Sequence, residues 1–219
     1  SGGFTVTQQA VQYMSVPYIL KYGSDLLKSK YLPGIISGDL ISCIGITEPN
    51  AGSDVQNIQT NAIKKGDNYI VNGSKTFITN GVYGDFIVTV VKTDPAAKSK
   101  GISLLVIDLD SPGITKTKID KLGWRSSDTA ELSFDNVVVP SENLVGEEGK
   151  GFYYLMNGLQ LERLCFMPSS IATMEFAISE SLSKILYVLL WLLKLGHLLG
   201  NTAISKSEKG ISVGWLKLL

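Results

Sequence analysis

The sequence is short of the residues from which most metal and nucleophile sites are built. It has one histidine and two cysteines among 219 residues. The histidine, His197, lacks the neighbouring ligands of a zinc site and the partners of a catalytic triad. Cys43 and Cys165 lie far apart in apolar sequence, which argues against a disulfide framework and favours a reducing compartment. We therefore expect no metal site.

The sequence also lacks net charge and a dinucleotide fingerprint. Its 20 Lys and Arg balance 20 Asp and Glu, and no basic stripe or tail supports nucleic-acid or anionic-membrane binding. No G-x-G-x-x-G follows an apolar strand, so a Rossmann unit is unsupported. With 44% hydrophobic residues the chain can bury a sizeable core.

The periodicity of apolar residues divides the chain into three parts. Gln8 to Ser37 is typical of helices broken at Pro17, and the helical period returns from Gly151 to about Leu182. Between them, from Ile41, short β-branched runs alternate with turns, which favours an antiparallel barrel or sandwich. The expected strands are residues 41–46, 69–71, 86–91, 102–107, 114–119, 132–134 and 137–139.

The segment G-I-T-E-P-N-A-G-S-D, residues 45–54, ends an apolar run in a predicted tight turn. Such a turn exposes backbone N–H groups. With the hydroxyls of Thr47 and Ser53 it can bind carbonyl or phosphate oxygens without a charged side chain. An ordinary strand-turn with a Ser-Asp cap remains the alternative for this segment by itself.

Three further motifs accompany this segment. They are K-T-F-I-T-N-G at residues 75–81, G-W-R-S-S-D-T at residues 123–129 and E-E-G-K-G-F at residues 147–152. Together the four motifs resemble the acyl-CoA dehydrogenase family, most of all its long-chain and isovaleryl branches, over about residues 8–183. Asn57 departs from the family pattern, which has a small residue there.

The resemblance implies an α+β fold in which a β-barrel middle domain lies between two helical domains, both incomplete here. Residues 1–40 would end the N-terminal helical domain and residues 41–140 would form the β-barrel domain. Residues 141–183 would begin the C-terminal helical domain, and residues 184–219 would be an atypical tail.

The resemblance also implies an FAD site. Thr47 would bond the pyrimidine edge of the flavin, and Ser53 would lie near the pyrophosphate and the acyl-CoA. Phe77 suits a flat apolar ring and Thr79 can hydrogen-bond a ring nitrogen, although strand pattern alone makes Phe77 a core aromatic. The implied FAD-binding residues are Ile44, Gly45, Ile46, Thr47, Ser53, Phe77, Ile78 and Thr79.

A carboxylate lies on the apolar side of the predicted helix after Gly151. The apolar residues at helical spacing are Phe152, Leu155, Met156 and Leu159. Glu162 falls on the same face. Burial there would raise its pKa toward that of a base at neutral pH, while Arg163 would oppose the rise. The pattern alone favours the alternative that Glu162 is a boundary residue paired with a Lys or Arg.

By resemblance, Glu162 occupies the place of the catalytic glutamate in the long-chain and isovaleryl branches. It would remove the α-proton of an acyl-CoA while the β-hydrogen leaves as hydride to the flavin, and its N–H would help to stabilise the thioester oxygen. Tyr153 lies half a turn out of phase with Glu162, and the loop of Ser99 and Lys100 is equally a mobile solvated loop. The implied substrate contacts are Ser53, Ser99, Lys100, Tyr153, Gln160 and Arg163.

The resemblance stops near Ala177. The family's R-x-A-F-G segment is absent, no arginine follows Arg163, and residues 184–219 hold five lysines and one glutamate. This change indicates a frameshift, an alternative exon or a damaged gene. The run of about fifteen residues from Ile185 contains Lys194 and His197 and falls short of the ~20 residues of a span. We expect a buried or aggregation-prone helix and no membrane span.

The expected activity is FAD-dependent α,β-dehydrogenation in fatty-acid or branched-chain acyl-CoA oxidation. The implied partners are an acyl-CoA, an electron-transfer flavoprotein and the other subunits of a homotetramer, in the mitochondrial matrix of a eukaryote or the cytoplasm otherwise. Two alternatives stay open: an acyl-CoA oxidase, and a catalytically dead truncated remnant or acyl-CoA-binding module.

Overall fold

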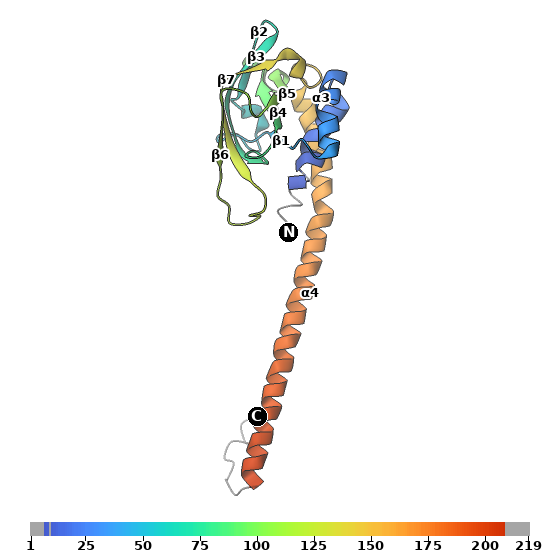
Figure 1. Cartoon of the computed structure of the whole chain (residues 1–219), viewed down its shortest axis with the longest axis vertical. Coiled ribbons are helices and arrows are strands. Elements are labelled where there is room, and N and C mark those ends of the chain that lie inside the picture. The colour runs from blue at the N-terminus through green and yellow to red at the C-terminus, as the bar shows by residue number, and fades with distance from the viewer. Residues whose placement is uncertain (1–6, 9, 209–219) are drawn as a thin grey trace. The chain divides into compact units, whose positions relative to one another are not determined.

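A computed structural model describes residues 7–8 and 10–208. The chain forms two compact units that divide between Cys165 and Phe166. The first unit holds the sheet and the N-terminal helices, and the last helix begins in the first unit and continues into the second (Figure 1). The helices are the π-helix η1 (Ala10–Ser15), α2 (Val16–Tyr22), α3 (Asp25–Ser37), the short 3₁₀ segments η2 (Val55–Asn57), η3 (Pro95–Gly101) and η4 (Ser141–Asn143), and α4 (Gly151–Glu208).

The helices before the sheet form where the sequence predicts them. Pro17 lies in the first turn of α2, where its missing N–H leaves no helical hydrogen bond unmade. The Ser24 hydroxyl accepts a hydrogen bond from the Leu27 N–H and caps α3. Gly38, with φ of 86°, ends α3 in the left-handed conformation. The break predicted at Pro17 is therefore the start of a new helix.

A single seven-stranded sheet forms the β domain, in the order β1-β4-β2-β3-β7-β6 with β5 on β4. The strands are β1 (Ser42–Gly45), β2 (Asn61–Lys65), β3 (Asn68–Thr79), β4 (Phe86–Lys92), β5 (Ile102–Asp108), β6 (Ile114–Lys118) and β7 (Thr129–Pro140). The β domain between helices is confirmed. Its sheet is mixed, because the β2–β3 hairpin returns the chain so that β1 and β4 run parallel.

Three strand predictions differ from the structure. β2 was not predicted because only Ala62 of its residues is buried, so it lacks apolar alternation. The two short strands predicted at 132–134 and 137–139 are one strand, β7. Asn136, with a φ of 51°, lies at an irregularity within β7, where the pairing with β3 shifts between Phe134 and Val137. β3 continues to Thr79 through two register shifts, which extends it beyond the predicted residues 69–71.

The strands β4 and β5 are buried on both faces, which explains their continuous apolar sequence. Phe86 and Val88 pack in one core cluster with residues of α2 and α3, whereas Ile87 and Val91 pack in a second cluster with β3 and β7. Alternate side chains of one strand therefore build two cores. This arrangement fixes the helices against one face of the sheet.

The first turns of α4 close the helical side of this core. Leu155 is fully buried, and Phe152, Met156 and Leu159 pack against the cluster. A Cβ atom on Gly158 would lie 2.1 Å from the Tyr18 hydroxyl oxygen, so only glycine allows this approach of α2 and α4.

Replacing this glycine tests the packing. Gly158→Ala should lower the free energy of unfolding by about 1–3 kcal/mol, because its methyl group overlaps buried Tyr18. Gly196→Ala, in the same helix with no neighbour within 4 Å, should instead be neutral or gain up to about 1 kcal/mol. Thermal unfolding followed by near-UV circular dichroism compares the two. Equal effects of both substitutions would contradict the packing.

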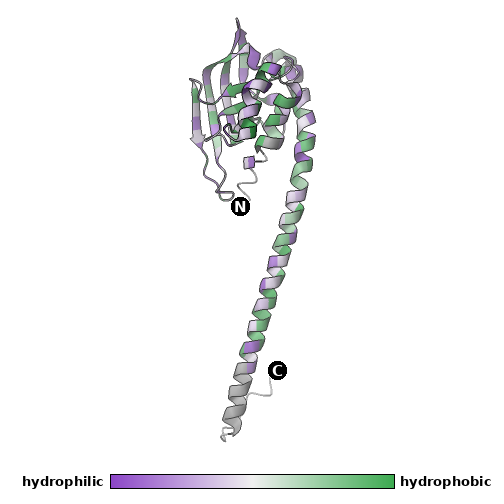
Figure 2. Ribbon diagram, turned by 45° about the vertical axis from the view of Figure 1, so that its right-hand side comes forward, coloured by the Kyte–Doolittle hydropathy of each residue, from purple (hydrophilic) through white to green (hydrophobic). Residues whose placement is uncertain are grey.

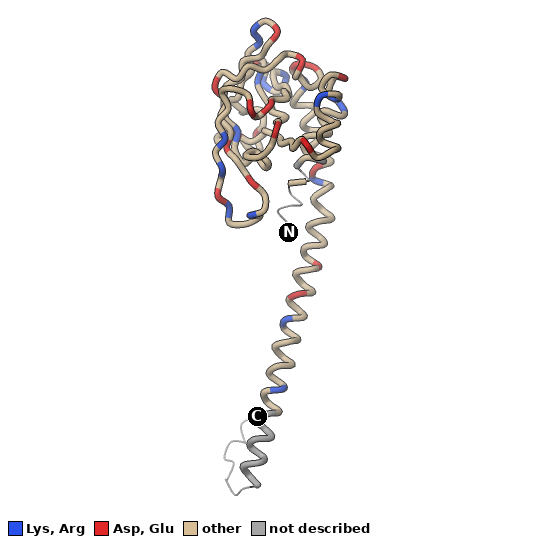
Figure 3. Tube along the Cα trace, viewed as in Figure 1, with Lys and Arg blue, Asp and Glu red and all other residues tan. Residues whose placement is uncertain are grey.

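The second unit is the continuation of α4. The helical period predicted to about Leu182 and the helix expected from Ile185 form one continuous helix, because α4 continues to Glu208. The Leu-rich run from Ile185 to Leu195 favours helix and holds no glycine or proline. Its large apolar side chains are exposed rather than buried. Figures 2 and 3 show this segment as largely hydrophobic with few charges. Residues 209–219 of the expected tail lie outside the described residues.

Within the described residues, α4 is long and apolar enough to cross a membrane by composition alone. The most apolar part holds Glu180 and Lys184, and helices of soluble proteins meet the same criterion. The finding thus gives weak support to a span. The segment from Ile185 to Leu195 nevertheless presents an exposed apolar surface.

This surface should cause self-association. We expect the wild-type chain to sediment as oligomers or larger particles. Leu189→Lys combined with Leu193→Lys should shift it toward monomer, because both side chains are exposed in the apolar run. The control, Ser179→Lys with Ser183→Lys, adds the same charge to exposed positions outside the run. Sedimentation velocity measures the difference, and a monomeric wild-type chain would refute the expectation.

Candidate functional site

A cavity of about 400 Å³ lies in the first unit among β1, the end of β3 and the start of α4. It brings together residues of the first two sequence motifs and the carboxylate of α4. Its lining residues are Met14, Ile44, Ile46, Thr47, Gly52, Ser53, Val55, Phe77, Ile78, Thr79, Met156, Leu159, Glu162 and Arg163. Of the predicted FAD-binding residues, only Gly45 is not among them.

The loop after β1, residues 46–60 and here named the cavity loop, forms one wall. The N–H of Glu48 bonds the carbonyl of Ala51 at 2.8 Å and the reverse bond is 3.2 Å, which closes the predicted turn. Thr47 and Ser53 line the cavity on either side of this turn. Neither hydroxyl makes a hydrogen bond to another described residue, so both are available to a ligand.

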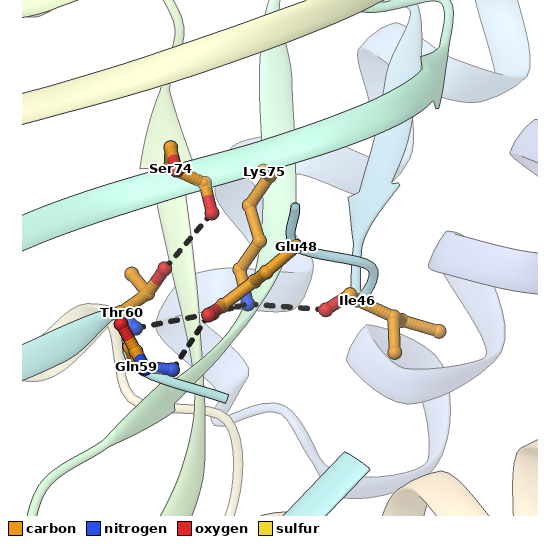
Figure 4. Close-up of polar contacts among 6 residues, drawn as sticks. All are labelled: Ile46, Glu48, Gln59, Thr60, Ser74 and Lys75. Atoms are coloured by element: carbon orange, nitrogen blue, oxygen red, sulfur yellow. Dashed lines mark hydrogen bonds and ion pairs between the residues drawn. The ribbon is translucent and has the colours of Figure 1, made fainter. Parts of the chain in front are cut away.

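Beneath the cavity loop, Glu48 and Lys75 form a buried ion pair (Figure 4). The Lys75 ammonium lies 2.7 Å from the Glu48 carboxylate and donates to the Ile46 carbonyl at 3.2 Å. The carboxylate also accepts from the N–H groups of Gln59 at 2.5 Å and Thr60 at 3.1 Å. Lys75 thus holds the start of the cavity loop directly, and Glu48 links the end of the loop to the same pair.

The environment moves both pKa values of this pair. Burial alone would raise the Glu48 pKa, but the Lys75 charge and the hydrogen bonds from Lys75, Gln59 and Thr60 outweigh it and lower the pKa. Burial lowers the pKa of Lys75 to about 8, even though the Glu48 carboxylate opposes this shift. Glu48 is therefore ionised at neutral pH, and Lys75 loses its proton more readily than an ordinary lysine.

The end of β3 forms the facing wall. The pairing of β3 with β7 is irregular between Lys75 and Ile78, and Phe77 adopts a φ of 59°. This conformation is rare for an aromatic residue, and it leaves the side chain 67% exposed at the cavity. The alternative of Phe77 as a core aromatic is wrong. A strained, exposed aromatic beside a cavity is suited to a flat ligand.

Glu162 reaches the same cavity from α4, together with Arg163. Burial raises its pKa, and the neighbouring Arg163 lowers it by less. In the described part of the chain the ion pairs are Lys30 with Asp108 and Lys75 with Glu48, so Glu162 makes none. The alternative of Glu162 as a salt-bridged boundary residue is therefore wrong, and the carboxylate lines the cavity without an ion-pair partner among the described residues.

The other predicted substrate contacts lie elsewhere. Ser99, Lys100 and Tyr153 line a second cavity of about 410 Å³, which Glu147 and Lys150 also line. Gln160 is exposed and lines neither cavity. The half-turn phase difference along α4 accounts for the separation of Tyr153 from Glu162.

Sequence reasoning missed two features of the site. The apolar side chains Met14 and Val55 reach the first cavity from separate elements, and no local pattern identifies them. The Glu48–Lys75 pair joins residues 27 positions apart. One acidic and one basic residue, each in an otherwise largely uncharged motif, could have suggested that the two residues pair. Over residues 7–8 and 10–208, no group of His, Cys, Asp and Glu has the geometry of a metal site.

The fold and the residues of this site are those of a known protein family. Residues 43–137 match the acyl-CoA dehydrogenase middle domain. Over the matched part, the chain belongs to the acyl-CoA dehydrogenase family.

Particular relatives support this assignment. The chain is 43% identical to mitochondrial isovaleryl-CoA dehydrogenase of Oryza sativa subsp. japonica, over 80% of the chain and 43% of the relative. It is 43% identical to mouse long-chain specific acyl-CoA dehydrogenase, over 76% of the chain and 39% of the relative. A crystal structure of acyl-CoA dehydrogenase from Geobacillus kaustophilus superposes with a TM-score of 0.71 at 53% identity, over 73% of this chain and 43% of that one. The chain thus spans less than half the length of these relatives.

The electrostatics of Glu162 can be tested without any ligand. Its raised pKa means that the ionised carboxylate opposes folding above the ordinary glutamate pKa. Glu162→Gln should therefore raise the free energy of unfolding at pH 7, by up to about 1 kcal/mol after solvent screening. The difference should vanish below about pH 4, where both side chains are neutral. Urea unfolding at both pH values measures it, and destabilisation at pH 7 would show a stabilising charge instead.

Proposed function

We propose that this chain carries the flavin and substrate site of an FAD-dependent acyl-CoA dehydrogenase, which oxidises the Cα–Cβ bond of an acyl-CoA thioester. The observation that carries the proposal is the first cavity, where two hydroxyl-bearing walls face a glutamate with a raised pKa. The relatives named for isovaleryl-CoA and long-chain acyl-CoA support branched or long acyl chains as substrates.

The residues present fit FAD. Ile44, Ile46 and Ile78 offer apolar surface for a fused ring, and Phe77 offers an exposed aromatic face. Hydroxyls on both walls can hydrogen-bond the polar edges of the ring, in particular those of Thr47 and Thr79. When bound, FAD supplies the acceptor for the hydride that leaves Cβ.

Glu162 performs the proton transfer in this proposal. Its carboxylate takes the proton from Cα, and the electron pair of that C–H bond becomes the new π bond as the β-hydrogen leaves with its own electron pair. A raised pKa makes the carboxylate a stronger base at neutral pH. The Glu162 N–H is not the donor to the thioester oxygen that the resemblance implied, because Glu162 lies inside α4, where backbone N–H groups bond the carbonyl four residues earlier. Arg163, in the same cavity, opposes the rise of the Glu162 pKa.

The second cavity is proposed to receive the CoA moiety. Lys100 and Lys150 place two cationic groups there, which suits phosphate oxygens, and Ser99 and Tyr153 add hydroxyls. The family resemblance further supports an electron-transfer flavoprotein as the electron acceptor and a homotetramer as the assembly. The mitochondrial names of the relatives support the matrix as the compartment in a eukaryote.

One experiment tests this function. The wild-type chain is titrated with FAD and then mixed anaerobically with isovaleryl-CoA or a long-chain acyl-CoA while flavin absorbance is followed. We expect FAD binding and bleaching. Glu162→Gln should retain FAD and slow bleaching by about 10²–10⁴-fold, because the base is gone. Glu175→Gln, at an exposed position of the same helix, should behave as wild type. FAD binding without bleaching in the wild type would favour a binding module, and no FAD binding would refute the proposal.

A further inference from the structure

The Glu48–Lys75 pair is the most buried charged group of the described chain and takes no part in the proposed chemistry. Lys75 is fully buried and Glu48 is nearly so. Neither residue lines the first cavity, yet each lies directly behind one of its walls. Lys75 precedes Phe77 by two residues on β3, and Glu48 follows Thr47 in the cavity loop.

We propose that the Glu48–Lys75 pair is a positioning device that holds the cavity loop against β3 and so sets the spacing of the two walls of the flavin cavity. The expected effect of the pair on FAD binding rests on the proposed function. The expected effect on the position of the cavity loop does not.

The hydrogen bonds around the pair fix the orientation of Thr47. Lys75 holds the carbonyl of Ile46, and the N–H of Thr76 holds the carbonyl of Thr47 at 2.9 Å. Because a peptide unit is planar and trans, its N–H points opposite to its carbonyl. The N–H of Thr47 therefore points away from Lys75. It makes no hydrogen bond to another described residue, so it is available at the cavity together with the Thr47 hydroxyl.

The far end of the cavity loop depends on the same carboxylate. The N–H groups of Gln59 and Thr60 both donate to Glu48, and the Thr60 hydroxyl donates to the carbonyl of Ser74 at 3.2 Å. The loop is consequently clamped at both ends by contacts that converge next to Lys75. Removal of the charge should loosen the segment that carries Thr47 and Ser53 while the strands stay intact.

A purely stabilising role is a poor explanation for this pair. The desolvation penalty of burying two charges offsets much of the free energy of their attraction. Replacing both partners by neutral groups therefore often leaves the stability unchanged. Positioning and stability can therefore be separated by comparing a single with a double replacement. Lys75→Met leaves Glu48 buried without its counter-charge. Adding Glu48→Gln removes that charge and keeps one of the two oxygens that accept from the N–H groups of Gln59 and Thr60.

The experiment measures melting temperature, amide hydrogen exchange and FAD affinity for the full chain and both variants. Exchange is followed without flavin at Ala51 and Thr76, whose N–H groups bond loop carbonyls and contact neither replaced side chain. We expect Lys75→Met to lower the melting temperature and the double variant to recover it. The double variant should still exchange at least about ten-fold faster at both amides and bind FAD at least about ten-fold more weakly. Lys30→Met, which breaks the exposed pair with Asp108, is the matched control and should change none of these.

Two results separate the possible failures. A double variant with wild-type exchange at Ala51 and Thr76 would overturn the positioning role. Faster exchange in a chain that binds no FAD even as wild type would support positioning and refute the proposed function.

The pH dependence of the wild type provides a test without substitutions. Glu48 is the charged group that acts on Lys75 among the described residues. Because the Lys75 pKa is lower in the folded than in the unfolded chain, its deprotonation above about pH 8 does not reduce global stability. It does remove the charge that holds the Ile46 carbonyl. Loop exchange, corrected for its intrinsic pH dependence, should rise above pH 8 while the melting temperature does not fall from this cause. Unchanged corrected exchange would contradict the proposal.

Discussion

A buried carboxylate and a buried ammonium must neutralise each other for this fold to present its cavity. Glu48 and Lys75 lie 27 positions apart, on the cavity loop and on β3. Neither charge could remain buried unpaired without a large desolvation penalty, so folding brings the two segments together. The hydrogen bonds of the pair to the cavity loop then fix which groups of that loop face the ligand.

The remaining parts of the site are placed by the two cores. Burial of β4 on both faces fixes β1 beside it and holds α4 against the helical core. The contact of Tyr18 with Gly158 brings α4 close enough for Glu162 to reach the cavity. Phe77 then remains in a strained and exposed conformation, which is the kind of local cost that proteins retain at functional sites.

Sequence motifs predicted much of the site but not how it is held. The resemblance of the motifs to the acyl-CoA dehydrogenase family implied the residues of the two walls, and helical spacing put Glu162 on the apolar face of α4; all but Gly45 line one cavity. The Glu48–Lys75 pair was missed because it depends on strand pairing across many residues. β2 was missed because its mostly exposed residues lack an alternating pattern. The continuity of α4 was missed because the abrupt change in composition after Leu182 suggested a separate helix, although the new residues also favour helix.

The central claim is that Glu162 removes a proton from Cα of an acyl-CoA held in the first cavity. A 3-thia-acyl-CoA isolates that step, because it has an acidic α-proton and no β-hydrogen to transfer. The direct measurement is deuterium incorporation at Cα by nuclear magnetic resonance, in deuterated buffer with FAD present. The account predicts incorporation with the wild-type chain and none above background with Glu162→Gln. Equal incorporation by both, or none by the wild type, would contradict it.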